Sequence, residues 1–96
     1  MFSVGDKIRF AEEKFPYTIQ AGDERYLVCT KPFNLRKGVV LYTIVDLEKK
    51  VRGADWCWKW GGQYDYSQRE ECEECLKALY TFEVEISYRA IPLKIV

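Results

Sequence analysis

A run of seven residues near the middle of the chain, residues 39–45, constrains the fold more than any other segment. Its sequence, V-V-L-Y-T-I-V, is apolar or β-branched at nearly every position. A strand with one face in water alternates apolar and polar residues, whereas a strand covered on both faces does not. The run therefore predicts a central strand with a packed layer on each side, which ends at Asp46.

Three segments on the N-terminal side indicate further strands. Residues 7–10 alternate charged and apolar side chains, which is typical of a short strand. Residues 17–21 and 25–31 flank the turn-forming sequence G-D-E, and this pattern predicts a β-hairpin. Pro32 lacks the amide hydrogen that a strand interior requires, so the second arm ends there.

Residues 68–80 are predicted to form the one helix of the chain. Apolar positions recur there at the spacing i, i+3, i+4, i+7, at Cys72, Cys75, Leu76 and Leu79. Glutamates occupy the other faces. Ser67 and Glu70 have the spacing of a capping box, in which each side chain bonds a free backbone amide at the helix start.

The chain is predicted to end in a strand, because residues 82–89 alternate strictly. Phe82, Val84, Ile86 and Tyr88 are assigned to the core. Strands followed by one helix and a last strand indicate an α+β fold. We expect a small antiparallel β-sheet of five to six strands, curled into an SH3-like open barrel, with the helix before the last strand.

Length and composition limit the classes of function. Ninety-six residues form one domain, residues 1–96, and the 15 basic and 15 acidic side chains cancel. The absence of histidine excludes Ser-His and Cys-His nucleophile pairs. The N-terminus is charged and no segment is long and apolar enough to cross a membrane, so we expect a cytoplasmic protein whose cysteines stay reduced.

The sequence C-E-E-C, with Cys72 and Cys75, has three interpretations. Free cysteine behaves as a small buried apolar residue, and the helical spacing favours this interpretation. A zinc site would need Cys29 and Cys57 as further ligands, without a second C-x-x-C pair. A redox site is disfavoured because the glutamates before Cys72 would raise its pKa. We therefore expect neither a metal nor another cofactor.

The segment D-W-C-W-K-W-G-G, residues 55–62, is the most aromatic part of the chain. As a strand it would place its three tryptophans on one face. That face is either core or an exposed platform for a partner, and the two interpretations remain open. If it is exposed, the predicted partner-binding residues are Trp56, Trp58, Trp60, Tyr64 and Arg52.

Basic residues in two loops suggest an alternative, a nucleic-acid-binding domain. If both loops lie at one end of the sheet, they form an anion-binding patch. The residues concerned are Arg36, Lys37, Lys49, Lys50 and Arg52, with Lys31 nearby. No phosphate-binding loop, nucleophile elbow or cluster of metal ligands is present, so the sequence predicts no catalytic residue and no enzyme.

Five segments together resemble a family of small, uncharacterised proteins encoded by bacteriophages, plasmids and other mobile elements. These segments are Y-T-I-Q-A (17–21), C-T-K-P-F-N (29–34), L-Y-T-I-V-D-L (41–47), V-R-G (51–53) and E-V-E-I-S-Y-R (83–89). They occur in the family's order and span most of the chain. The chain departs from the family pattern at W-C-W-K-W-G-G-Q-Y (56–64), where the family is less aromatic.

The resemblance implies a non-enzymatic accessory protein of a phage or mobile element, without a catalytic residue that can be transferred. Small neutral proteins of this setting often bind a host protein. An anti-CRISPR or other anti-defence role is therefore the expectation, by association with the setting and not by chemistry.

Overall fold

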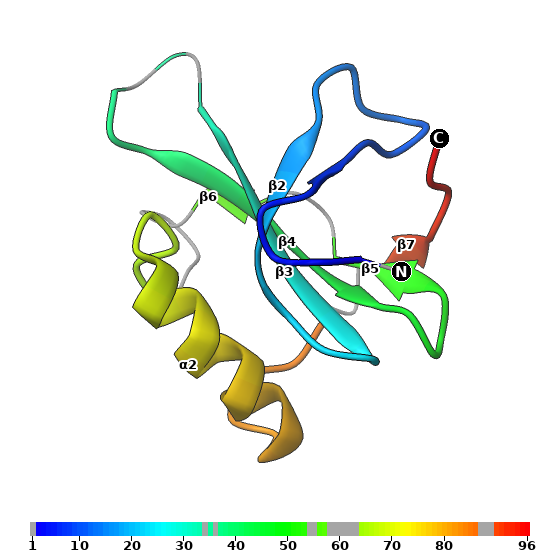
Figure 1. Ribbon diagram of the computed structural model, residues 1–96, viewed down its shortest axis with the longest axis vertical. Helices are drawn as coiled ribbons and strands as arrows, with labels where there is room; N and C mark the ends of the chain where they lie inside the picture. The colour runs from blue at the N-terminus through cyan, green and yellow to red at the C-terminus, as the bar shows by residue number, and fades with distance from the viewer. Residues whose placement is uncertain (1, 34, 36, 54–55, 58–63, 87–89) are drawn as a thin grey trace.

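The computed structural model describes residues 2–33, 35, 37–53, 56–57, 64–86 and 90–96. In this part of the chain, one α-helix packs against a curled antiparallel sheet, a half-barrel (Figure 1). The predicted α+β class, with a helix before the last strand, is confirmed. The elements are β1 (Lys7–Ile8), β2 (Tyr17–Gly22), β3 (Tyr26–Pro32), β4 (Val40–Asp46), β5 (Val51–Arg52), β6 (Trp56–Cys57), α2 (Arg69–Tyr80) and β7 (Ile91–Pro92).

The strand β4 has the most strand partners in the sheet. The strand order is β1-β2-β3-β4-β5-β7, and β6 pairs with β4 in addition. On one edge β4 pairs with β3 along its whole length. On the other edge its last residues pair with β5, while Leu41 and Tyr42 pair with β6. The prediction of a central strand in this region is confirmed.

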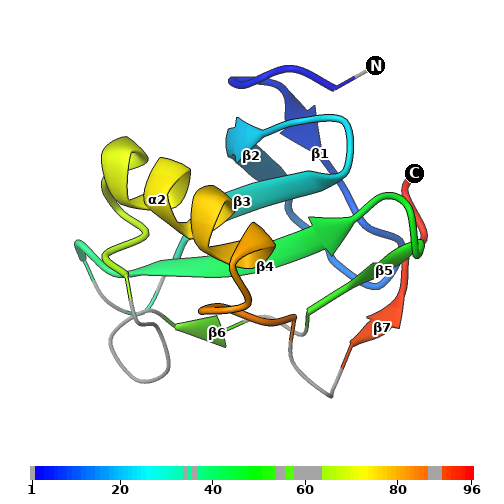
Figure 2. The ribbon, with the colours of Figure 1, turned by 90° about the horizontal axis from the view of Figure 1, so that it is seen from below.

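The sheet has a packed core on each face, as the unbroken apolar run of β4 predicted. The helix-side core contains Ala21, Tyr26, Val28, Ile44, Tyr66, Cys72, Cys75 and Leu79. The barrel-side core contains Ile8, Phe10, Tyr17, Ile19, Leu27, Cys29 and Val45. Successive residues of β3 alternate between the two cores, because neighbouring side chains of a strand point to opposite faces. Figure 2 shows α2 beside β2 and β3, with β5 and β7 at the far end of the sheet.

A β-bulge in β2 lets this strand contribute to both cores. The pairing with β3 shifts register between Ile19 and Ala21. Ile19 lies opposite Cys29 in the barrel-side core, and Ala21 lies opposite Val28 in the helix-side core. A bulge inserts one extra residue and so changes which face the following side chain occupies.

The helix α2 lies within one residue of its predicted range and buries the predicted stripe. Cys72, Cys75 and Leu79 are buried and Leu76 is half-buried. The predicted capping box is wrong. The N-cap residue is Gln68, which makes no side-chain cap bond, and the Ser67 hydroxyl donates instead to Asp65 Oδ1.

The predicted strand at residues 82–89 is wrong where the structure describes it. Phe82 has a positive φ of 61°, and the Glu83 amide donates to the Ala78 carbonyl at 3.1 Å. This is the Schellman turn that often ends a helix, with phenylalanine at the position usually held by glycine. Phe82 is 80% exposed. The assignment of Val84 and Ile86 to the core is nevertheless supported, because both side chains pack against the helix-side core.

The last strand is instead β7, at the edge of the sheet beside β5. Its Pro92 agrees with the expectation that a proline in this segment limits any strand to an edge. Tyr88, predicted to lie in the core, falls outside the described residues.

Candidate functional site

The predicted aromatic surface is described only in part. Trp56 opens β6, where it pairs with Tyr42, while Trp58 and Trp60 lie outside the described residues. Tyr64 is half-buried and meets Tyr66 edge-on, with ring centroids 6.3 Å apart. Tyr66 is buried and stacks on Tyr42, with centroids 3.7 Å apart and an interplanar angle of 9°. The tryptophan platform therefore stays a prediction, whereas Tyr64 forms the outer edge of an aromatic stack.

Arg52 does not lie on the surface where the sequence analysis placed it. It is 1% exposed, and its guanidinium lies over the Phe10 ring, 4.3 Å from the centroid. Its Nη2 donates to Glu12 Oε1 at 2.8 Å and to Glu13 Oε2 at 3.3 Å. Its Nη1 donates to Thr43 Oγ1 at 3.3 Å. These partners account for its burial, because a charge inside a protein must be paired and hydrogen-bonded.

The described lysines of the predicted basic patch lie at opposite ends of one strand. Lys37 lies before the start of β4, whereas Lys49 and Lys50 follow its end. At about 3.3 Å per residue, the seven residues of β4 hold the two loops roughly 20 Å apart. Lys31 instead forms an ion pair with Glu13, and Arg36 is outside the described residues.

The cysteines of the C-x-x-C sequence pack as apolar side chains. The Cys72 thiol donates to the Tyr66 carbonyl at 3.4 Å, and Cys75 Sγ lies 3.5 Å from the Tyr66 hydroxyl. Burial raises the pKa of Cys72 to about 12, and it also raises the pKa of Cys75. Thiols in this state are protonated at neutral pH and are poor nucleophiles.

Cys29, the third described thiol, lies in the other core, and its pKa is likewise raised to about 12 by burial. The side chain of Cys57, the fourth candidate ligand, is outside the described part of the chain. Among the described residues, no three His, Cys, Asp or Glu side chains are grouped so as to hold a metal ion. The predicted packing role of Cys72 and Cys75 is confirmed.

An apolar groove of about 540 Å³ lies where β3 ends and β4 begins. We call it the apolar groove; it is lined by Phe15, Pro16, Lys31, Pro32, Phe33, Leu35 and Leu41. Leu35 is 83% exposed and Phe15 is 54% exposed. The sequence analysis missed this site because it considered only the basic residues of this loop, Arg36 and Lys37. The available signal was the pair of large apolar residues, Phe33 and Leu35, inside a loop.

The apolar groove adjoins the first residues of the aromatic segment. Leu41 lines the groove and also pairs with Cys57 of β6. Lys14 directly precedes Phe15 in the chain and Lys37 lies two positions after Leu35, and both lysines are exposed. At the groove wall, the Lys31 ammonium bonds Glu13 and lies 4.5 Å from the centroid of the Tyr17 ring. Apolar contact area and exposed positive charge therefore occur together at this end of the sheet.

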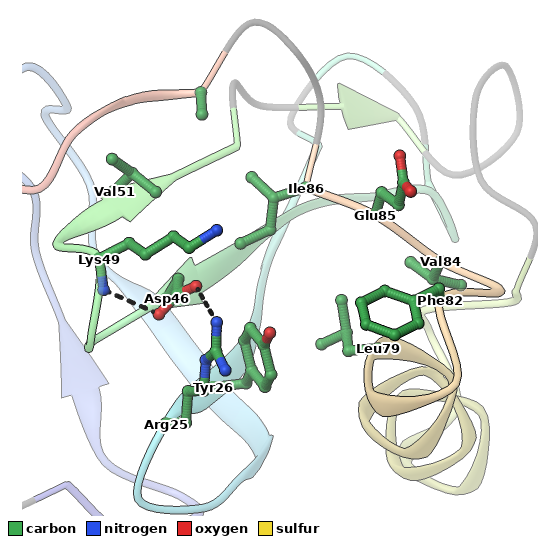
Figure 3. Close-up of a pocket in the computed structure, with 11 residues that line it drawn as sticks. Arg25, Tyr26, Asp46, Lys49, Val51, Leu79, Phe82, Val84, Glu85 and Ile86 are labelled. Carbon is green, nitrogen blue, oxygen red and sulfur yellow. Dashed lines mark hydrogen bonds and ion pairs between the residues drawn. The ribbon is translucent and has the colours of Figure 1, made fainter.

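A second hollow, of about 340 Å³, lies between the sheet and the chain that follows α2 (Figure 3). We call it the post-helix pocket. Arg25, Asp46 and Lys49 line it from the sheet. Leu79, Val84 and Ile86 line it from the helix end and the segment after it, with Phe82 and Glu85 beside them.

No family model, no curated protein and no solved structure matches the chain. In the part of the chain that the structure describes, no helix combines the length and the apolar character needed to cross a membrane.

Proposed function

We propose that this protein is a non-enzymatic binding module that recognises another protein through the apolar groove and the aromatic segment beside it, residues 56–66. One observation carries the proposal: a groove with exposed Leu35 and Phe15 meets the start of the tryptophan segment on β4. Contiguous apolar patches on small proteins commonly mark interaction sites, and tryptophan and tyrosine dominate the binding energy of interfaces.

The charges around the groove favour an acidic partner surface. Glu13 is bonded to the groove residue Lys31 and to Arg52, whereas Lys14 and Lys37, which are close to groove residues in the chain, are exposed. A partner that presents apolar side chains flanked by Asp or Glu would complement this arrangement. In this proposal Trp56, Trp58, Trp60 and Tyr64 contact the partner, and Arg52 supports the groove from within the barrel.

The biological setting is part of the proposal. A product of a bacteriophage or another mobile element would act in the host cytoplasm on a host protein, with a defence protein such as a CRISPR component as the favoured class of target. The support for this setting is the resemblance of the five segments named above.

The test is capture of a partner from host-cell lysate, followed by an affinity measurement with the purified partner. Leu35→Asp places a charge in the groove and should weaken binding by about 30-fold or more, the size typical of an interface hot spot. Val96→Asp is the matched control, because Val96 is also an exposed apolar residue, 65% exposed, but does not line the groove.

Equal capture by both variants would contradict a role for the groove. Capture that disappears when the lysate is treated with nuclease would contradict a protein partner and favour the nucleic-acid alternative.

A further inference from the structure

The post-helix pocket has one polar and one apolar wall. Figure 3 shows Arg25, Asp46 and Lys49 on the sheet side, with Leu79, Phe82 and Val84 across from them. Arg25 directly precedes β3, Asp46 ends β4, and Lys49 lies in the turn before β5. A hollow of about 340 Å³ in which an apolar wall faces a few polar groups is typical of a small ligand site.

The carboxylate of Asp46 already accepts three hydrogen bonds from the protein, out of about four that a carboxylate can accept. Its Oδ1 accepts the backbone amides of Glu48 and Lys49, both at 3.0 Å. Its Oδ2 accepts Arg25 Nη2 at 3.3 Å. Asp46 is also 2% exposed, so its carboxylate is fixed in place. Breaking its pair with Arg25 would leave a buried charge without a partner, which is unfavourable.

The two cationic side chains, in contrast, have unused donors. Among the described residues, Arg25 Nε is buried and has no hydrogen-bond partner, and it lies 3.7 Å from Glu48 Oε2 in an ion pair. In the described part of the chain, no carboxylate pairs with the Lys49 ammonium, which Figure 3 shows extending toward Ile86. The Arg25 side chain as a whole is 33% exposed, so a ligand oxygen can approach its guanidinium from the pocket.

Phe82 adds an aromatic ring that the fold does not need. It is 80% exposed and has a φ of 61°, a conformation that is unfavourable for a residue with a side chain. Glycine would fill this turn without strain. A strained, exposed phenylalanine beside a hollow is therefore explained by contact with something that enters the hollow.

We propose that the post-helix pocket binds a single carboxylate attached to an apolar or aromatic group. The carboxylate would bond Lys49 and Arg25, and the apolar group would contact Ile86, Val84 and Phe82. Glu85 lines the opposite wall and adds a negative charge, which disfavours multiply charged anions such as phosphates. Two sources of this chemistry exist, a free aromatic acid and the C-terminal residue of a peptide.

The experiment is a titration of the ¹⁵N-labelled full chain followed by NMR. The probes are 3-phenylpropanoate, the peptide acetyl-GSGSLF with a free C-terminus, and the same peptide with a C-terminal amide. Saturable shifts at Lys49, Ile86 and Phe82 are expected with one or both acids and not with the amide. Binding of the small acid alone identifies a metabolite-type ligand, and stronger binding of the peptide acid identifies a peptide C-terminus.

Variants separate the pocket from the general surface. Lys49→Gln should weaken binding roughly tenfold, since it removes a charge-assisted hydrogen bond. Lys50→Gln is the matched control, because Lys50 is the neighbouring exposed lysine and does not line the pocket. Phe82→Gly should also weaken binding, while it raises the midpoint of thermal unfolding by roughly 4–8 °C as the strained turn relaxes.

The proposal is overturned if neither acid binds, if the amide binds as well as the acid, or if Lys49→Gln and Lys50→Gln behave alike. Ligand binding in the post-helix pocket does not depend on the apolar groove. Leu35→Asp should therefore abolish partner capture without changing this titration.

Discussion

The two cores of the sheet are built by alternate residues of the same strands, yet they are closed in different ways. The helix-side core is sealed by α2 and contains apolar, aromatic and thiol side chains. The barrel-side core is closed by short strands and loops, and charged side chains fill its mouth: Arg52 lies over Phe10 and Lys31 over Tyr17. Each cation is bonded to Glu13.

This difference shows how the closing element decides the chemistry of a core. A helix presents a continuous apolar stripe and can exclude water from one face of a sheet by itself. Loops and two-residue strands leave backbone groups and gaps, and long cationic side chains can fill such gaps while their charges are paired with glutamates. The barrel-side core is thus stabilised by specific pairs, and the helix-side core by burial of apolar area.

The largest expected effect comes from breaking the barrel-side pairs. Arg52→Ala removes a buried side chain that packs on Phe10, pairs with Glu12 and is one of the two cations bonded to Glu13, and it should lower the free energy of unfolding by about 3–5 kcal/mol. The measurement is denaturation in urea, with Lys37→Ala as the control, since Lys37 is exposed and should change stability by less than about 0.5 kcal/mol. A loss below about 1 kcal/mol for Arg52→Ala would contradict a buried, paired guanidinium.

A smaller effect is expected in the helix-side core, where no single pair is critical. Cys72→Ala and Cys75→Ala should each cost about 1 kcal/mol, the loss typical of removing one methylene-sized group from a core. Glu73→Ala on the exposed face is the control. Chelation with EDTA should leave the unfolding midpoint of the unmodified protein unchanged. If EDTA lowers it, the cysteines act as metal ligands and the packing role is incomplete.

The smallest effect on stability is expected from the hydrogen bond between the last residue of α2 and the β2–β3 turn. The Tyr80 hydroxyl donates to Asp23 Oδ2 at 2.7 Å, and Tyr80→Phe should cost about 1 kcal/mol at neutral pH. Burial acts to raise the pKa of Asp23, but hydrogen bonds from the Tyr26 amide, the Tyr80 hydroxyl and the Arg25 amide outweigh it, so the pKa is lowered from 3.8.

The sign of the pH dependence follows from this lowered pKa. The stabilisation by the Tyr80–Asp23 hydrogen bond is fully present above pH 3.8, where the Asp23 carboxylate is charged in both the folded and the unfolded state. It is lost as the pH falls through the lower pKa of the folded state. The difference between the unmodified protein and Tyr80→Phe should therefore shrink in acid, as measured by urea denaturation between pH 2 and pH 7, roughly the range that spans this titration. A difference that persists at the acid end would contradict a role for the Asp23 charge, because Tyr80→Phe keeps the ring packed on Tyr26 and removes only the hydroxyl.

Local patterns in the sequence were sufficient for the main elements. The spacing of Cys72, Cys75, Leu76 and Leu79 located α2, and the apolar run of β4 predicted a strand covered on both faces. Both are properties of a few adjacent residues, and periodicity is the strongest such signal. The failures at Ser67 and Phe82 are also local: Asp65 competes for the Ser67 hydroxyl, and a left-handed turn redirects the chain at Phe82.

The candidate sites depended on contacts between distant parts of the chain and were harder to predict. Arg52 appeared to be a surface residue because its partners, Glu12 and Glu13, lie about 40 positions earlier. The basic loops were thought able to converge, but only the pairing of β4 decides that Lys37 and Lys49 lie at opposite ends of one strand. The apolar groove likewise combines residues before β2 with residues after β3.

The three described cysteines are divided between the two cores, so their thiols can report on local opening of each core. An alkylating reagent can reach Cys72 and Cys75 only when α2 lifts from the sheet, and Cys29 only when the half-barrel opens. The rates at which these thiols are alkylated would therefore measure the opening of the two cores separately in the same protein.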